Sequence, residues 1–346
     1  MIKFLIIWIL IFSAIIPTSA LEISPPEVPS GAMARMPKET GSFIDGLWEV
    51  IQIAFESILP DFRQISQTAI SVICVVMLLT LIYPIQGTTK QLTEITGSIV
   101  ITLILLSGAH SMIDLAADTI QDLSDYGKLL CPVMTAAMAA QGSISTAAAL
   151  YAGTAFFDSI LCHMIAGLLV PMVYLVLVLS LVHCAFEESL LKRFCDTIKK
   201  ATSWLLKIIL TVFTTFMGIS GVISGHADAL ALKATKITIS SIVPVIGSTL
   251  SDASEAVLLS TGMAKNAAGI YGVFAILAIF LTPFLQISCH YIVLKITAAV
   301  CCIIGPGKVS NLIEEYSATM GLLMGMTGSV CLIQLISTVC FLKGVG

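Results

Sequence analysis

Residues 152–183, AGTAFFDSILCHMIAGLLVPMVYLVLVLSLVH, form an unusually long apolar run with Asp158 as its one acidic residue. A helix needs only about 20 such residues to cross a bilayer. The whole chain of 346 residues is 57% hydrophobic and 11% charged, with a mean hydropathy of +1.02, whereas a soluble domain carries roughly 25% charged residues. Such a chain cannot cover its surface with polar groups in water. We therefore predict an all-α, polytopic helical membrane protein.

The apolar runs on either side of residues 152–183 predict six or seven crossings in total. A short turn separates the first two runs, and an acidic loop at 114–128 follows the second. The expected spans are 68–85, 95–113, 152–183, 203–223, 267–287, 288–304 and 318–342.

The basic segment FEESLLKRFCDTIKK, residues 186–200, directs the expected topology. It carries the densest positive charge of the chain, and positively charged loops stay in the cytoplasm. If residues 129–150 and 152–183 both crossed after an outer acidic loop, this segment would lie outside. We therefore expect residues 129–150, which are rich in small side chains, to form a re-entrant segment or buried half-helix. The last span then leaves Lys343 at the inner face.

The N-terminal part has its own organisation. Residues 1–20 have the basic start, apolar core and small-residue end of a signal peptide; an uncleaved membrane anchor is the alternative. Residues 21–65 are expected to be an extracytoplasmic leader with an amphipathic helix at 43–59, which Pro60 ends. This helix either lies on the outer membrane face or packs against the bundle. Residues 66–346 form the polytopic membrane domain.

Sequence motifs for catalysis are absent. The segment GPGKVS at 305–310 lacks the first Gly and the Ser or Thr of a phosphate-binding loop, so we predict a turn there. The five histidines form no zinc motif, and the ten cysteines, without a C-x-x-C pair, fit small buried hydrophobes. We expect no enzyme activity, no cofactor, no metal and no nucleic-acid partner.

Ionisable groups inside apolar runs are costly in lipid and are often functional. The candidates are Asp158, His163, His290 and Lys295. Asp158 and His163 are five residues apart and lie on different faces of one helix, so a direct pair is not implied. A structural role, with Asp158 near a membrane edge and His163 bonded to a neighbouring helix, is the alternative. Lys295 is the strongest candidate for a lumen-facing or interhelical charge.

A polar-mixed region, residues 224–266, contains the apolar stretch SSIVPVIGSTLSDASEAV at 240–257. Pro244 and Gly247 interrupt the helix, and the following residues resemble an N-terminal helix cap. Irregular backbone at membrane depth needs protein or water around it, so a re-entrant segment is expected. It either lines a pore or plugs the space between helices. The candidate residues are Ser240, Pro244, Gly247, Ser251, Asp252 and Glu255.

The run LKATKITISSIVPVIGSTLSDASEAV, residues 232–257, followed by KNAAGIYGV at 265–273, resembles the signature region of stage III sporulation protein AE. The resemblance extends over the chain from about residue 43 and includes AAALYAGTAFFDSI at 147–160. It implies a multi-pass protein of the mother-cell membrane that engulfs the forespore. Such proteins belong to an eight-protein, channel-like or secretion-like complex on which late forespore gene expression depends. The resemblance implies no catalytic residue.

The partners implied are the other membrane proteins of the stage III A operon, an associated ATPase and a forespore-side channel partner, besides the lipid bilayer. A homo-oligomer is possible. The alternative function is a secondary transporter with its own small-molecule substrate. Broken helices and several converging charges at mid-membrane would favour transport.

Overall fold

The computed structural model describes residues 26–37, 43–82, 90–186, 189–242 and 247–343, and all their regular structure is helical. Six stretches are long and apolar enough to cross a membrane: 43–82, 93–140, 144–184, 190–219, 268–304 and 307–342. This confirms the all-α polytopic membrane fold. The helices are α2 (Ser30–Met33), α3 (Phe43–Ile82), α4 (Lys90–Ala140), α5 (Ile144–Met164), the π-helix η2 (Ile165–Leu169), α6 (Val170–Phe186), α7 (Ser189–Ile242), α8 (Gly247–Ile304) and α9 (Gly307–Lys343). The proposed signal peptide, residues 1–20, lies outside the described residues.

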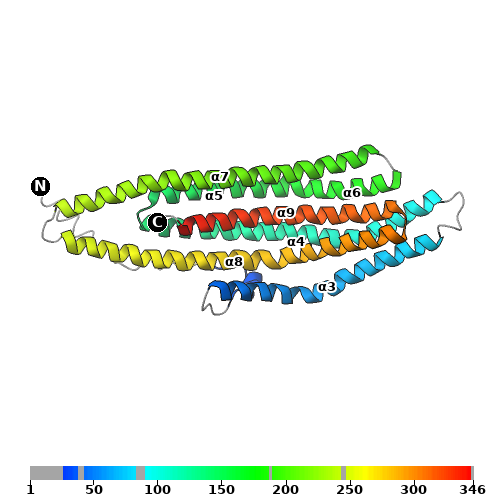
Figure 1. The fold of residues 1–346 in the computed structure, drawn as a ribbon, viewed down its shortest axis with the longest axis horizontal. Coiled ribbons are helices and arrows are strands. Elements are labelled where there is room, and N and C mark those ends of the chain that lie inside the picture. Colours follow the sequence, from blue (N-terminus) through cyan, green and yellow to red (C-terminus); the bar gives the residue numbers. More distant parts are fainter. Residues whose placement is uncertain (1–25, 38–42, 83–89, 187–188, 243–246, 344–346) are drawn as a thin grey trace.

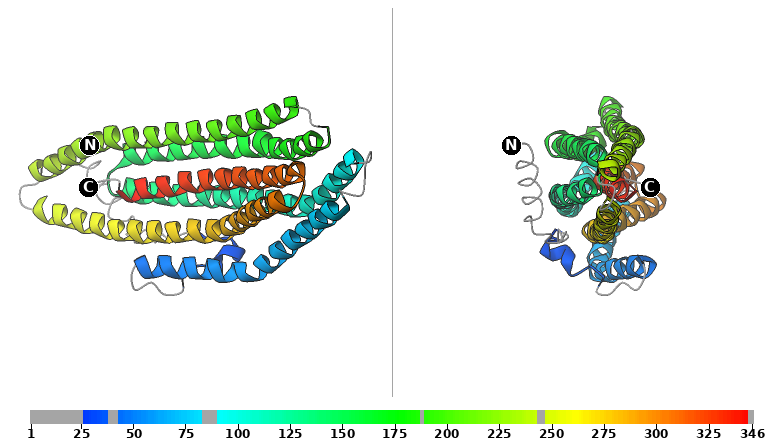
Figure 2. Two further views of the ribbon diagram at one scale, coloured as in Figure 1. Left: turned by 45° about the vertical axis from the view of Figure 1, so that its right-hand side comes forward. Right: turned by 90° about the vertical axis from the view of Figure 1, so that its left-hand side faces the viewer.

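Helix α9 occupies the centre of an elongated bundle (Figures 1 and 2). It packs against α4, α5, α6, α7 and α8. Within their apolar windows, 61% of the residues of α8 and of α9 are buried, against 22–33% in the other four spans. Small and hydroxyl side chains of α9, such as Ser317, Thr327 and Ser337, are buried at these contacts, which allows close helix packing. α8 and α9 therefore form the interior, and the other spans surround them.

Helix α3 continues through Pro60, so the prediction that Pro60 ends a helix is wrong. Neighbouring helices can compensate for the hydrogen bond that a proline removes, and α3 packs along α8. The Phe43 ring stacks on Phe274 at 5.2 Å between centroids, and the Gln286 amide donates to the Asp61 carboxylate. Figure 2 shows α3 bent along its length. The amphipathic stretch 43–59 thus packs against the bundle, which was the second of the two interpretations.

The long run 152–183 also passes a proline without a break. The π-helical turn Ile165–Leu169 ends two residues before Pro171. Proline has no N–H for the carbonyl four residues earlier, and a π-bulge is a usual way for a helix to absorb such a defect. α5, η2 and α6 consequently form one membrane-length segment, Ile144–Cys184.

Residues 129–150 are not a separate re-entrant segment. Residues 129–140 are the end of α4, and 144–150 are the start of α5. Gly142 joins them at φ 88°, with Ser143 N–H bonded to Met138 O at 3.3 Å and Gly142 N–H to Ala139 O at 2.9 Å. This is the Schellman arrangement, which favours glycine in the left-handed conformation. A glycine stop signal, rather than a half-crossing, therefore ends α4.

Two other expected boundaries are absent. The stretch 114–128, expected to be a loop, is helical within α4, and the runs 267–287 and 288–304 belong to the one helix α8. The candidate spans therefore number six among the described residues. The start of α7 lies at the same end of the bundle as the α8–α9 turn, which we call the basic end (Figure 1). α9 runs from that end to the other, so Lys343 lies at the end opposite the basic segment. The prediction that Lys343 lies at the same face as the basic segment is therefore wrong.

Candidate functional site

The signature region forms the far ends of two long helices. α7 reaches Ile242 and α8 begins at Gly247, and both extend past the other helices at the end opposite the basic end (Figure 1). Ser240 is in the last turn of α7. Ser251, Asp252 and Glu255 are in the first turns of α8, and Pro244 lies outside the described residues. Whether this segment lines a pore stays a prediction.

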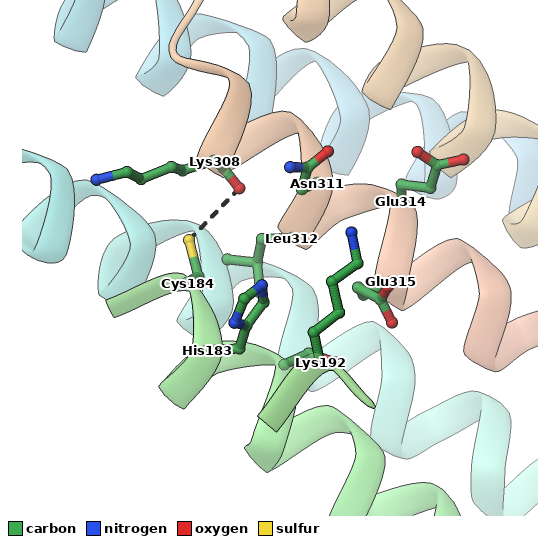
Figure 3. A pocket seen from close by; sticks show the side chains of 9 residues that line it. His183, Cys184, Lys192, Lys308, Asn311, Leu312, Glu314 and Glu315 are labelled. Atoms are coloured by element: carbon green, nitrogen blue, oxygen red, sulfur yellow. Dashed lines mark hydrogen bonds between the residues drawn. The ribbon is translucent and has the colours of Figure 1, made fainter. Parts of the chain in front are cut away.

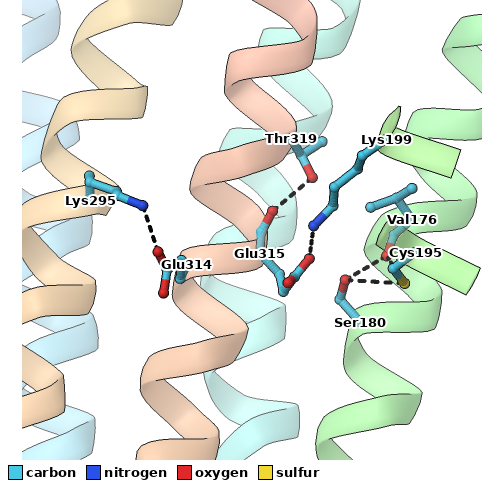
Figure 4. A network of polar contacts seen from close by, with 8 residues as sticks. All are labelled: Val176, Ser180, Cys195, Lys199, Lys295, Glu314, Glu315 and Thr319. Carbon is cyan, nitrogen blue, oxygen red and sulfur yellow. Dashed lines mark hydrogen bonds and ion pairs between the residues drawn. The ribbon is translucent and has the colours of Figure 1, made fainter. Parts of the chain in front are cut away.

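Three ion pairs connect the helices near the basic end, and Figure 4 shows the two that involve Glu314 and Glu315. Lys199 of α7 pairs with Glu315 of α9. Lys295 of α8 donates to Glu314 of α9 at 2.6 Å. The neighbours Glu314 and Glu315 point to different sides of α9, so the central helix is held from both sides. The third pair is between Lys308 of α9 and Glu94 of α4, at 2.5 Å.

These ion pairs differ in exposure. The side chains of Lys199 and Glu315 are 15% and 21% exposed, whereas those of Lys295 and Glu314 are 50% and 54% exposed. Exposed pairs contribute about 0–1 kcal/mol because water screens them, and breaking a buried pair costs more because one charge is left desolvated. The Lys199–Glu315 pair is therefore the one expected to matter for α7–α9 packing.

A small pocket of about 150 Å³ lies beside these pairs (Figure 3). Its wall includes His183 and Cys184 from the end of α6, Lys192 from α7, and Lys308 and Asn311 from α9. The Cys184 thiol donates to the Lys308 carbonyl at 3.4 Å, which joins α6 to the start of α9. Glu314 and Glu315 complete the wall, so the pocket combines side chains of both charges. Its geometry is that of a helix junction.

Asp158 is buried at 5% exposure and connects three helices. Its Oδ2 accepts from Ser124 Oγ of α4 at 2.7 Å, and its Oδ1 accepts from Gln334 Nε2 of α9 at 2.8 Å. The backbones come close here, since a Cβ on Gly127 would lie 2.2 Å from Gln334. A buried carboxylate requires such donors, so this cluster fixes α5 against α4 and α9.

The other predicted polar residues lie apart from Asp158. His163, in the last turn of α5, is exposed. His290 of α8 lines a second, larger cavity between α3, α4 and α8. The described residues contain no group of three His, Cys, Asp or Glu side chains placed to hold a metal ion.

Sequence reasoning did not find the partners of these groups. Gln334 and Ser124 are 176 and 34 residues from Asp158, and Glu315 is 116 residues from Lys199. Glu314 and Glu315 were visible as an acidic pair close to a span. Only the folded bundle shows which lysine each of them meets.

Comparison with known proteins gives one consistent family. The family described as stage III sporulation protein AE matches residues 34–344. A curated relative, stage III sporulation protein AE of Bacillus subtilis (strain 168), is 22% identical over 298 residues, which cover 85% of this chain and 75% of the relative. No solved structure matches the chain. Since the family match covers nearly all of the chain described above, the protein belongs to the stage III sporulation protein AE family.

Proposed function

We propose that this protein is a non-enzymatic, integral membrane component of the channel or secretion-like complex that connects the mother cell to the forespore. Late forespore gene expression depends on that complex. The observation that carries the proposal is the family match over residues 34–344, together with six helices long and apolar enough to cross a membrane. The proposed location is the mother-cell membrane that engulfs the forespore.

The proposed orientation follows from the positive charges at the basic end of the bundle. The basic end carries Lys192, Arg193, Lys199 and Lys200 at the start of α7, and such residues stay in the cytoplasm. With six crossings, the α4–α5 turn, the tips of α7 and α8 and the end of α9 then lie on the far side, toward the forespore. The signature region 232–257 is thereby available to a forespore-side partner.

Energy for transport comes from a partner. The sequence has no phosphate-binding loop, so the protein supplies the membrane part and an associated ATPase supplies nucleotide hydrolysis. The basic end faces the mother-cell cytoplasm, where such an ATPase would contact it. The other membrane proteins of the stage III A operon complete the assembly.

Compartment-specific complementation tests this proposal. In a deletion strain, a copy expressed from a mother-cell-specific promoter should restore heat-resistant spores to near wild-type numbers. The same copy expressed from a forespore-specific promoter should not restore them. Rescue from the forespore alone would contradict the proposed location.

A second candidate function is secondary transport of a small substrate. One observation favours it: a polar cavity of about 520 Å³ lies between α3, α4 and α8, among membrane-length helices. A transporter binds its substrate near mid-membrane. This function predicts uptake or export by the purified protein alone in proteoliposomes, whereas the channel-component proposal predicts none without the partners.

A further inference from the structure

The cavity between α3, α4 and α8 is lined by polar side chains from all three helices. α3 contributes Asp61, α4 contributes Ser107 and Ser111, and α8 contributes Gln286 and His290. The Gln286 amide donates to Asp61 Oδ2, which holds the carboxylate at the cavity wall. The volume of about 520 Å³ is large enough for several water molecules, since one water needs roughly 10–15 Å³ of such space.

The cavity lies toward the end of the membrane-spanning part that is opposite the basic end. Ser111 is about 26 Å along α4 from Glu94, which forms an ion pair at the basic end, and His290 is about 21 Å along α8 from Ile304. The hydrocarbon core of a bilayer is about 30 Å thick. A polar surface at this depth is costly in contact with lipid tails. Water, which needs polar partners, is the natural content of such a space.

The charges of the cavity favour cations. Among the described residues that line it, Asp61 is the only carboxylate, and none is a lysine or an arginine. α3 adds Gln64 and Thr68, so further side-chain oxygen atoms, the ligand type that hard cations prefer, line the same cavity. Asp118 is exposed two turns further along α4 on the same face as Ser111, and it extends the acidic surface toward the end opposite the basic end.

We propose that this cavity is a hydrated binding site for a small monovalent cation, with Asp61 as its charged ligand. The site does not depend on the proposed function: a channel component and a transporter could each contain it. It identifies a place in the bundle where water and cations enter the membrane-spanning region, on the opposite side of α8 from the Lys295–Glu314 pair.

Charge-selective cysteine labelling tests the proposal in the full chain, with the ten native cysteines replaced, in membrane vesicles. Ser107→Cys and Ser111→Cys should react with a cationic, membrane-impermeant thiosulfonate. When each rate is divided by that of the same reagent with a free thiol in solution, the cationic reagent should react about tenfold faster than an anionic one. The Asp61 carboxylate attracts the cationic reagent and repels the anionic one. Asp61→Asn should remove most of that preference. Leu106→Cys is the matched control, because it is exposed at the same depth on the apolar side of α4 and should be at least about 100-fold slower.

Two further measurements test the content of the cavity. Gly108 lines it, and an added Cβ would lie 3.7 Å from His290 Cε1, an ordinary contact. Gly108→Leu should therefore slow labelling at Ser111→Cys at least tenfold, while Gly108→Ala should leave it unchanged. Sodium ions should slow cationic labelling at concentrations at which choline does not. The proposal would be overturned if the cysteines at positions 107 and 111 did not react, if the cationic and anionic reagents reacted at equal rates, or if sodium and choline slowed the labelling equally. None of these results depends on spore formation, so they are separable from a failure of the proposed function.

Discussion

The Asp158 cluster provides the sharpest test of how the bundle is held together. Asp158→Leu replaces the buried carboxylate with an apolar side chain of similar size. It leaves Ser124 Oγ and Gln334 Nε2, now bonded at 2.7 Å and 2.8 Å, without their acceptor. Asp158→Asn is the matched control, because an amide can accept from Gln334 and donate to Ser124 Oγ.

The expected magnitude follows from the two lost bonds. An unsatisfied buried polar group costs about 1–3 kcal/mol in soluble proteins, but a side-chain hydrogen bond between membrane helices averages about 0.6 kcal/mol and reaches about 1.7. We expect Asp158→Leu to lower the free energy of unfolding by about 1–3 kcal/mol, and Asp158→Asn by less than about 1 kcal/mol. The midpoint of thermal unfolding should fall by about 1–2 °C per kcal/mol, because the unfolding entropy grows with the number of residues.

The assay is thermal unfolding of the purified protein in a mild detergent, followed by far-ultraviolet circular dichroism. Gln334→Leu closes a double-mutant cycle. The double variant should be less destabilised than the sum of the single variants by about 1 kcal/mol, because both remove the same contact. The reasoning would be refuted if Asp158→Leu matched the wild type, or if Asp158→Asn were as unstable as Asp158→Leu.

Three other perturbations have defined outcomes. Lys199→Met should destabilise the detergent-solubilised protein by about 1–2 kcal/mol and Lys295→Met by less than about 1 kcal/mol, because the Lys199–Glu315 pair is less exposed than the Lys295–Glu314 pair. Equal losses of stability would contradict this ranking. Gly153→Ala should lower the unfolding midpoint, because its Cβ would lie 2.2 Å from the Phe216 ring. Gly218→Ala meets nothing within 4 Å and should raise the free energy of unfolding by about 0.5–1 kcal/mol. Effects of the same sign for both variants would show that the α5–α7 contact is looser than described. If residues 240–250 line a pore, single cysteines on one side of the segment should react with an impermeant thiol reagent and those on the other side should not. Uniform protection would contradict pore lining and favour a segment that plugs the space between helices.

The general fold could be predicted from composition, because an apolar run long enough to cross a bilayer as a helix is rarely found outside membrane proteins. Helix ends were harder, because the local rules for proline come from soluble proteins. Pro60 and Pro283 lie inside α3 and α8, since neighbouring membrane helices compensate for the missing hydrogen bond. Gly142 was a readable stop signal, but the small residues around it resembled a half-helix.

The polar contacts could be predicted only in part. Asp158, His290 and Lys295 stood out because ionisable residues are rare in apolar runs. Asp61 did not, because it follows the proline that was expected to end a helix, outside any predicted span. Its approach to Gln286, 225 residues further on, depends on α3 continuing through that proline and packing along α8. Such pairings come from tertiary packing and leave no periodic signal in one sequence.

The central claim, membership in the complex that sustains the forespore, is tested most directly by one measurement. The gene is deleted in its native host, and a late forespore transcription reporter is followed after engulfment is complete. The proposed function predicts that engulfment finishes normally while the reporter signal is lost. Normal late transcription and normal spores would contradict the proposal and direct attention to transport by the protein alone.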